Sequence, residues 1–479
     1  MWSKSKWRAA AFAALTLALV MSACGAEEEP APEEPEAAAV TTAAPEPAPE
    51  PAPEEPEEAA VTTAAPEAAP AEDPDACDEI ITLRLLRWQG DTLDIAIADY
   101  KEVEPCVEIA VEEVPFGQLY EKISIVATSD DPPDILLYDG PFTQSYAEAG
   151  MLLPLDDYIS DEHLNDILFA TRSEHSYQGV LYSPGLEQSA MALFYNKDMT
   201  DAAGINPPQD ISEAWTWEEA VAAFQKIQDE GIAEWGLAPS AFGDGTPGFA
   251  YRDLIMTRSM GDPNAAMDSS AYRTFWAISD DGCTVDGYLN TPEAIEGLEF
   301  YAKMFNEWEI TPKVGIPNAL LDGTAAFGLE PPFVAGVLEA NADFEWGITP
   351  VPYFNTPFTH TGSVTVGVSA KTKYPDEAAA FVMFATNPEQ SKKYSDNYQS
   401  LPVRQSILDQ QTFFEVYPQS IFAESLAVAG QPRPPTPAFT QYEQIVTTAL
   451  GDIALGADAQ ETMDSAVAQL DPILARYCG

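Results

Sequence analysis

The alternation of apolar and polar residues predicts strands and helices in turn over the first part of the folded region. Residues 80–88, 107–114 and 133–140 have the composition of strands, and the first and third are almost continuously apolar. The two intervening stretches, 91–103 and 118–129, place apolar residues at helical spacing. Strands that alternate with helices predict parallel βαβ units, whose sheet is covered by helices on both faces. The pattern therefore predicts an α/β fold.

A capped helix is predicted further along the chain. The sequence from Thr216 to Glu219 is Thr-Trp-Glu-Glu, a capping box in which the hydroxyl and the carboxylate satisfy free amides at a helix start. The apolar residues that follow share one helical face with Trp217, which we therefore expect in the core. Trp215 precedes the cap and is expected to fold back on the first turn rather than to hold a ligand.

The N-terminus predicts an export signal. Three cations precede an apolar run, residues 9–20, that is too short to span a bilayer as a helix. Small residues stand directly before Cys24, which resembles the processing site of bacterial lipoproteins, although Met21 stands where that pattern prefers leucine. We expect a signal peptide over residues 1–23 and lipidation of Cys24. The alternative is ordinary signal cleavage, with Cys24 lost or left free.

A low-complexity segment follows Cys24. Residues 25–76 contain only Ala, Pro, Glu, Val, Thr, Asp and Gly, and the motif EPEAAAVTTAAPE at 34–46 returns as EPEEAAVTTAAPE at 55–67. Proline blocks helix and sheet while like charges repel, so this segment cannot build a core. We expect residues 24–76 to be a disordered tether that begins at the lipidated cysteine. The alternative is an insertion with no length requirement.

The chain is strongly acidic. It carries 78 acids against 22 Lys and Arg, a net charge of −56, and residues 77–479 alone keep 62 acids against 19 cations. Such a charge repels phosphate backbones and anionic lipid, which argues against nucleic acid as a partner and against an anionic ligand drawn in by long-range steering. An acidic surface kept for solubility, in a salty habitat for example, is the alternative reading of the charge.

Four cysteines remain beyond Cys24, in an exported chain without a CxxC pair. An even number in an oxidising compartment predicts two disulfides, for which three connectivities exist. Cys77 and Cys106 each stand just before a predicted strand, and parallel neighbouring strands would bring them together at one sheet edge. We therefore expect the pairs Cys77–Cys106 and Cys283–Cys478, with free buried thiols as the alternative.

Six segments follow one another behind the lipoprotein signal: SDDPPDILLYDGPFTQSYAEAGMLLPLDDYI, GVLYSPGLEQSAMALFYNKDM, AGINPPQDISEAWTWEEA, LLDGTAAFGLEPPF, FEWGITPVPYF and SLPVRQSIL. Taken in this order, they resemble the extracellular solute-binding proteins of ABC importers, in the sugar-binding family related to maltose-binding protein. The similarity runs over nearly all of residues 80–475.

The resemblance implies a two-lobed periplasmic-binding-protein-like fold of type II. Each lobe would be a mainly parallel sheet flanked by helices, with the ligand cleft between the lobes. The expected bounds are 77–188 plus 363–399 for the N-terminal lobe and 189–362 plus 400–479 for the C-terminal lobe. The chain would cross between the lobes near Glu187–Ala190, Gly362–Val364 and Gln399–Pro402.

The same resemblance implies the function. The protein would be the substrate-binding component of an ABC transporter, capturing a sugar or oligosaccharide by hinge closure and delivering it to the transmembrane subunits of a permease. It would be a monomer without cofactor or metal, break no bond, and be anchored through Cys24 to the outer face of the bacterial cell membrane, at the cell surface or in the periplasm.

Ligand-binding residues are inferred by matching positions to the family pattern, because sugar sites pair aromatic rings with carboxylates, amides and arginine. The first group follows strands and the first crossing: Trp88, Gln89, Asp91, Tyr138, Asp139, Gln188 and Ser189. The second group comes from later segments: Ser240, Phe242, Glu330, Phe333, Ser363, Arg404 and Tyr442. Relatives often carry Trp at the position of Phe333. Whether Phe333 provides the aromatic surface on which a sugar ring stacks is therefore left open.

Several of these residues have structural alternatives. Trp88 and Phe333 could belong to the core of a lobe, and Tyr138 could pack under the next loop. Asp91 and Asp139 could be turn acids that bond local amides, and Arg404 could pair only with an acid across its lobe.

Three other functions are alternatives to sugar transport. Carboxylates beside aromatic rings also occur in glycosidases, but the chain has no GxSxG or HExxH motif and its three histidines lack metal-ligand spacing. A receptor for a cationic small molecule such as a polyamine is compatible with the overall charge. An adhesive surface lipoprotein would need no cleft.

Overall fold

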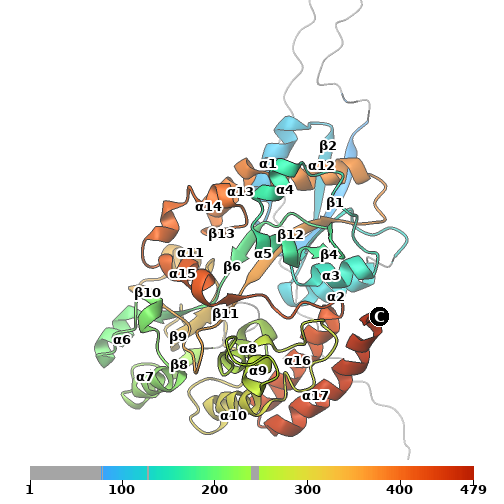
Figure 1. Cartoon of the computed structure of the whole chain (residues 1–479). Helices are drawn as coiled ribbons and strands as arrows, with labels where there is room; N and C mark the ends of the chain where they lie inside the picture. The colour runs from blue at the N-terminus through green and yellow to red at the C-terminus, as the bar shows by residue number, and fades with distance from the viewer. Residues whose placement is uncertain (1–76, 78, 127–128, 239–246, 479) are drawn as a thin grey trace, which may run out of the picture. The chain divides into compact units, whose positions relative to one another are not determined.

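The computed structural model describes residues 77, 79–126, 129–238 and 247–478 (Figure 1). The chain divides into two units, Met1–Ala71 and Glu72–Gly479, and everything described belongs to the second. The predicted signal peptide, the lipidation site Cys24 and the tether lie outside the described residues.

Six strands form the larger sheet, in the order β13-β6-β12-β3-β1-β2. Their bounds are β1 (Ile81–Trp88), β2 (Val107–Val114), β3 (Ile135–Asp139), β6 (Glu187–Ser189), β12 (Gly362–Val368) and β13 (Leu401–Pro402). Strand β1 pairs in parallel with β2 and β3, as predicted, whereas β12 is antiparallel to β3 and to β6, and β13 is antiparallel to β6. The sheet is therefore mixed rather than mainly parallel, because strands from later in the chain insert in the opposite direction.

Burial on both faces explains why β1 and β3 are almost continuously apolar. Leu85 and Leu137 belong to a core cluster shared with α1 (Asp94–Val103) and α12 (Pro375–Ala385). Leu86 and Leu136 point to the other face, into a cluster that includes residues of α2 (Phe116–Val126) and α3 (Phe142–Glu148). Because successive side chains of a strand point to opposite faces, β1 and β3 pack against a helical layer on each side of the sheet.

Four strands form the second sheet, in the order β10-β7-β9-β8. They are β7 (Ala192–Asn196), β8 (Trp235–Ala238), β9 (Ala325–Glu330) and β10 (Trp346–Thr349). Only β8 and β9 pair in parallel, so this sheet is mixed as well. Two short two-stranded ladders are β4 (Ser176–Tyr177) with β5 (Val180–Leu181), and β11 (Thr359–His360) with β14 (Gly430–Gln431).

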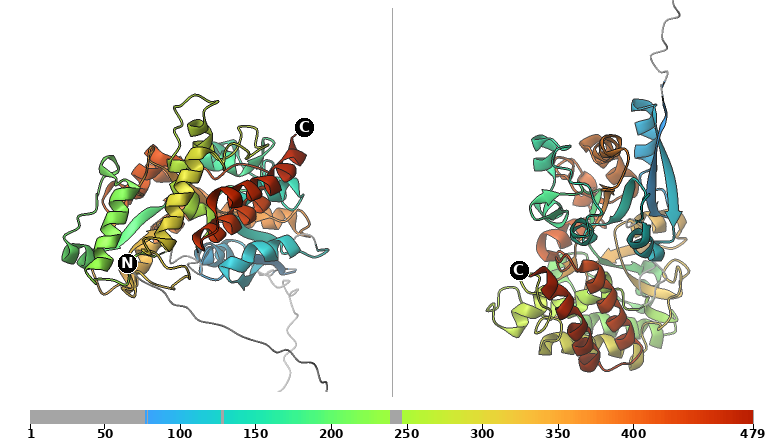
Figure 2. Two further views of the ribbon diagram at one scale, coloured as in Figure 1. Left: turned by 90° about the horizontal axis from the view of Figure 1, so that it is seen from below. Right: turned by 90° about the vertical axis from the view of Figure 1, so that its right-hand side faces the viewer.

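The remaining helices divide between the two sheets. Around the six-stranded sheet lie α4 (Asp161–Asp166), α5 (Phe169–Glu174), α13 (Pro388–Tyr398) and α14 (Gln405–Leu408). Around the four-stranded sheet lie α6 (Lys197–Ala203), η1 (Ile211–Glu213), α7 (Trp217–Asp229), α8 (Ala250–Ser259), α9 (Ser270–Trp276), α10 (Pro292–Asn306), α11 (Val334–Asn341), η2 (Thr412–Glu415), α15 (Ser420–Ala429), α16 (Phe439–Ala454), α17 (Ala459–Leu474) and η3 (Ala475–Tyr477). Helices α16 and α17 pack side by side near the C-terminus (Figure 2). No helix of the described part combines the length and the apolar character needed to cross a membrane.

The capped helix forms as predicted. The side chain of Thr216 accepts a hydrogen bond from the amide of Glu219, and the carboxylate of Glu219 accepts one from the amide of Thr216. Trp217 is buried with the apolar face of α7. The ring of Trp215 is half-buried and lies 6.1 Å from the ring of Phe327, so both tryptophans serve packing.

The chain passes between the two sheets at three places. Strand β6 leads through Ala190 directly into β7, and the segment after β10 returns through β11 into β12. At the third place, Leu401 of β13 pairs with Gln188 of the larger sheet and also belongs to the core cluster that contains Phe194 and Ile348 of the smaller sheet. Arg404, three residues further on, still forms a bridge with Ile167.

Both predicted disulfides are present. The Cα atoms of Cys77 and Cys106 are 5.5 Å apart, at the edge where β1 and β2 begin. Those of Cys283 and Cys478 are 5.9 Å apart and tie the C-terminal end of the chain to the loop between α9 and α10.

Candidate ligand-binding site

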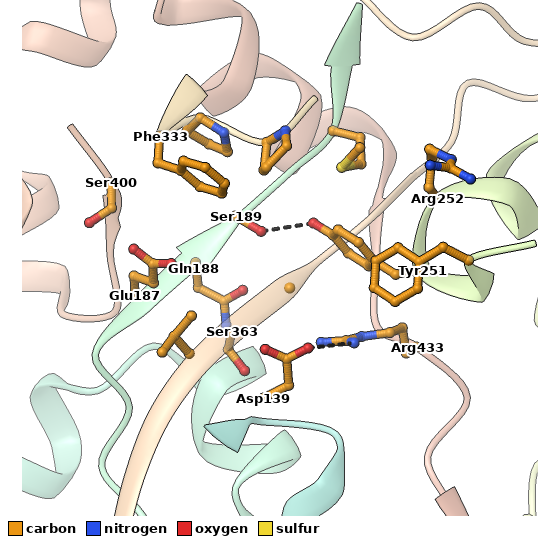
Figure 3. Close-up of a pocket in the computed structure, with 16 residues that line it drawn as sticks. Asp139, Glu187, Gln188, Ser189, Tyr251, Arg252, Phe333, Ser363, Ser400 and Arg433 are labelled. Carbon is orange, nitrogen blue, oxygen red and sulfur yellow. Dashed lines mark hydrogen bonds and ion pairs between the residues drawn. The ribbon is translucent and has the colours of Figure 1, made fainter. Parts of the chain in front are cut away.

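A cavity lies between the two sheets, against the strands on which the chain crosses from one to the other (Figure 3). Its volume is about 60 Å³, room for about five water molecules at about 10–15 Å³ each. It is lined by Asp139, Glu187, Gln188, Ser189, Met191, Phe249, Tyr251, Arg252, Pro331, Pro332, Phe333, Gly362, Ser363, Val364, Ser400 and Arg433. Strands β6 and β12 provide its centre, and the start of α8, the β9–α11 connection and the segment after β14 provide the wall from the other lobe.

An ion pair joins the two sides of this cavity. A guanidinium nitrogen of Arg433 lies 3.1 Å from a carboxylate oxygen of Asp139, and both side chains are largely buried, with 3% and 16% exposure. The same guanidinium lies over the rings of Tyr251, at 4.9 Å, and Phe439, at 5.7 Å. Asp139 ends β3 and Arg433 follows β14, so this contact links segments that are far apart in the sequence.

Two further carboxyl groups, those of Glu174 and Glu443, lie near this ion pair. Burial raises the pKa of Glu174 to about 7, and the positive charge of Arg433 opposes the rise. Burial likewise raises the pKa of Glu443 to about 7, again against the influence of Arg433. Arg433 is thus the cation that partly compensates three carboxyl groups in a region shielded from water.

Glu174, His175 and Ser363 form a small hydrogen-bond network, which reaches the cavity at Ser363 in β12. Ser363 donates to a carboxylate oxygen of Glu174, and its oxygen lies 2.8 Å from Nε2 of His175. Burial lowers the pKa of His175 to about 3, so the ring is neutral. Gly140 is required beside this network, because a Cβ atom there would overlap Ser363 and His175.

One carboxyl group of the cavity is not compensated in this way. Glu187 is partly buried, and among the described residues no Lys, Arg or His forms an ion pair with it. Burial raises its pKa to about 7, and the negative charge of Asp139 raises it further, while the hydroxyls of Ser400 and Tyr394 lower it. Figure 3 shows Glu187 and Ser400 on one side of the cavity and Tyr251, Arg252 and Arg433 on the opposite side.

Apolar and aromatic groups complete the lining. Phe333, Pro331 and Pro332 all line the cavity, and the hydroxyl of Tyr251 is 2.8 Å from that of Ser189. The cavity therefore combines flat apolar surfaces with hydroxyl, amide and carboxylate groups, the mixture with which proteins orient small polar ligands.

The structure brings together five of the predicted ligand-binding residues. Asp139, Gln188, Ser189, Phe333 and Ser363 all line the cavity. Ser240 and Phe242 lie outside the described residues. The other seven do not line the cavity.

Each of those seven residues has a specific place elsewhere. Trp88 packs half-buried against two core clusters, and Gln89 and Asp91 are exposed. Tyr138 is fully buried, its ring 5.2 Å from that of Tyr146, because side chains alternate along β3 and only its end reaches the cavity. Arg404 donates to the carbonyl of Thr386 and lies 3.5 Å from Asp166, the pairing across its lobe that was the alternative for it. Glu330 and Tyr442 are buried in β9 and α16.

Sequence reasoning missed several lining residues. Glu187 stands within a predicted crossing, next to Gln188, so its position was indicated although its role was not. Arg433 is the lone cation of the stretch GQPRPPTP, and Tyr251 lies in the first turn of α8, a helix that is buried along its whole length. A lone arginine in a proline-rich connection can indicate a functional position, but only the fold shows which groups the arginine faces.

Two α/β lobes connected by crossing segments, with a cleft between them, define the type II periplasmic-binding-protein fold. A solved ABC transporter solute-binding protein from Thermotoga lettingae TMO, bound with α-D-tagatose, has this fold: it superposes with a TM-score of 0.70 at 18% identity, over 83% of this chain and all of that one.

The sequence comparisons define the family. The model of the bacterial extracellular solute-binding protein family matches residues 89–392, and the chain belongs to this family. A binding protein of Brucella abortus (strain 2308) is 23% identical over 399 residues, 79% of this chain and 88% of that one. A maltotriose-binding protein of Pyrococcus abyssi (strain GE5 / Orsay) is 25% identical over 324 residues, 65% of this chain and 63% of that one.

Proposed function

We propose that this protein is the substrate-binding component of an ABC importer and that it captures a sugar in the cavity between its lobes. The observation that carries the proposal is the lining itself, in which aromatic and proline surfaces face hydroxyl, amide and carboxylate groups. Sugars present apolar C–H faces and rims of hydroxyls, so both kinds of group find a partner. Similarity to a maltotriose-binding relative supports the same ligand class.

The proposed mechanism is hinge closure. The three crossing segments lie next to one another, since β6 pairs with both β12 and β13. A rotation about these short segments would separate Arg433 and Tyr251 from Asp139 and Ser189, with which they are in contact here. Because a hexose is larger than the five or so waters that the cavity could hold, the ligand enters an open form, and contacts from both lobes shift the equilibrium toward closure.

The closed form would be the one that transmembrane subunits of a permease recognise, with the protein acting as a monomer. We place the first lobe at residues 77–189 with 362 to about 410, and the second lobe at 190–361 with the remainder. This division follows the strands of the two sheets. In this role the protein breaks no bond in its ligand.

We further propose that the mature chain begins at a lipidated Cys24 and is held at the outer face of the cell membrane by the segment of residues 25–76. Replacing Cys24 with serine is expected to move the protein from the membrane fraction to the soluble exported fraction, because the lipid acceptor is lost. Cell fractionation and immunoblotting, with the wild-type chain alongside, measure this. Equal membrane association of the two proteins would contradict the anchor.

The ligand contact can be tested at Phe333. After a thermal-shift screen of monosaccharides and oligosaccharides identifies a binding sugar, Phe333→Ala is expected to weaken its affinity at least about tenfold, since a stacked ring and its buried area are lost. Isothermal titration calorimetry measures the change. Trp88→Ala is the matched control, because Trp88 does not line the cavity, and it should alter affinity by less than about twofold. The reverse ranking of the two variants would overturn this placement of the site.

A further inference from the structure

The charges that line the cavity do not balance. Its two cations are each held by a carboxylate: Arg252 contacts Asp253 at 2.5 and 2.8 Å, and Arg433 contacts Asp139 at 3.1 Å. Glu187 then remains as a carboxyl group that faces the cavity without a cationic partner among the described residues. Glu174 and Glu443, close to Arg433, add negative charge to the same region.

A carboxylate shielded from water without a cationic partner is costly, and proteins keep one mainly where something else supplies the compensating charge. The neighbour of Glu187 in β6 points to the same need. Gln188 is 5% exposed and lines the cavity, its Nε2 donates to Thr171, and its Oε1 has no hydrogen-bond partner. Glu187 and Gln188 thus provide hydrogen-bond acceptors on this side of the cavity, and a ligand bound there would supply the donors.

The rest of the lining has a different character. Tyr251 and Phe333 contribute aromatic rings to it, and the hydroxyls of Tyr251 and Ser189 already bond each other. A linear polyamine would have no use for these flat surfaces together with a compact cluster of hydrogen-bonding groups. A ring-shaped ligand with one positively charged substituent would use both parts of the lining.

We propose that the ligand is an amino sugar, whose ammonium group lies against Glu187 while its ring lies against Tyr251 and Phe333. The inference rests on the proposed function and names the class of sugar that this cavity takes. The ammonium group donates hydrogen bonds to Glu187 and Gln188 and supplies the charge that the cavity lacks. Burial raises the pKa of Glu187, because the ionised form is unfavourable there until a cation arrives.

The test compares matched ligands on the wild-type protein. The probes are D-glucosamine and D-galactosamine, their parent hexoses, their N-acetyl derivatives, short glucosamine oligomers with their N-acetylated forms, and putrescine. The amines are expected to bind at least about tenfold more tightly than both the parent and the N-acetylated sugar, which keeps the bulk and removes the charge. Titration calorimetry at pH 7 measures all of them.

The role of Glu187 is tested with Glu187→Gln, which keeps shape and removes charge. Its ratio of amine to parent-hexose affinity is expected to fall to near one, while Glu218→Gln, on the exposed start of α7, keeps the wild-type ratio. Neutral sugars that bind as well as or better than the amines overturn this inference and leave the proposed function standing. Putrescine binding without any sugar overturns both. An amine preference that survives in Glu187→Gln overturns the assignment to Glu187, and the comparison on the wild-type protein holds whether or not the variant folds.

Discussion

Replacing Arg433 with methionine is expected to lower the free energy of unfolding by about 3–5 kcal/mol at pH 8, the usual cost of removing one partner of a buried ion pair. Arg433 is 4% exposed and is the cation that faces Asp139, Glu174 and Glu443. Methionine fills a similar volume but leaves those carboxylates without compensation. Urea denaturation followed by circular dichroism measures the change.

The loss should depend on pH in a defined direction. Burial raises the pKa of Glu174 and of Glu443 from 4.5 to about 7, and the charge of Arg433 holds both pKa values down. Between these pH values the folded protein keeps protons that the unfolded chain releases, so the stability linked to these groups is full below pH 4.5 and is lost as the pH rises through 7. Without Arg433 both pKa values should rise further, so the variant should lose less at pH 5 than at pH 8.

Two further variants make this expectation specific. Adding Asp139→Asn to Arg433→Met removes the charge that faced the arginine and should recover part of the stability at pH 8. Arg476→Met, at an exposed position near the C-terminus, should leave stability unchanged at both pH values. An equal deficit for Arg433→Met at pH 5 and pH 8 would show that lost packing, not uncompensated charge, causes the destabilisation.

Local patterns were sufficient to predict the elements but not their arrangement. The apolar run of β1 and the cap at Thr216 depend on neighbours within a few residues, and both were predicted correctly. The insertion of β12 beside β3 pairs Val364 with Asp139, which are far apart in the chain, and no local pattern encodes the direction of that pairing. The pairing of Leu401 with Gln188 at the third crossing likewise joins segments that are far apart in the chain.

The candidate site, too, could be predicted from local sequence only in part. Of the predicted residues at the carboxyl ends of strands, Asp139 lines the cavity, whereas Gln89 and Asp91 do not. The reason is strand order: β3 is the direct neighbour of the crossing strand β12, whereas β1 lies one position further out. Arg433 could not be inferred at all, because its partner Asp139 is 294 residues away in the sequence and only the tertiary fold brings them together.

Removing the disulfide between Cys283 and Cys478 is expected to cost about 5 kcal/mol of unfolding free energy, against about 3.5 kcal/mol for the one between Cys77 and Cys106. A cross-link stabilises mainly by restricting the unfolded chain, and the restriction grows with the length of the closed loop. The two sequence separations are 195 and 29 residues, which sets the order of the two costs.

The native contacts around the longer cross-link favour the same ranking. Asp471 of α17 accepts hydrogen bonds from the hydroxyl of Thr284 and from the amide of Val285, both at 2.8 Å, and these contacts hold the loop of Cys283 in place in the folded protein. The folded state therefore survives loss of the bond, and the unfolded state gains the freedom. The two double variants, Cys283→Ser with Cys478→Ser and Cys77→Ser with Cys106→Ser, serve as controls for each other in urea denaturation. A cost for the shorter loop that equals or exceeds that for the longer one would contradict the restriction of the unfolded chain as the source of stability.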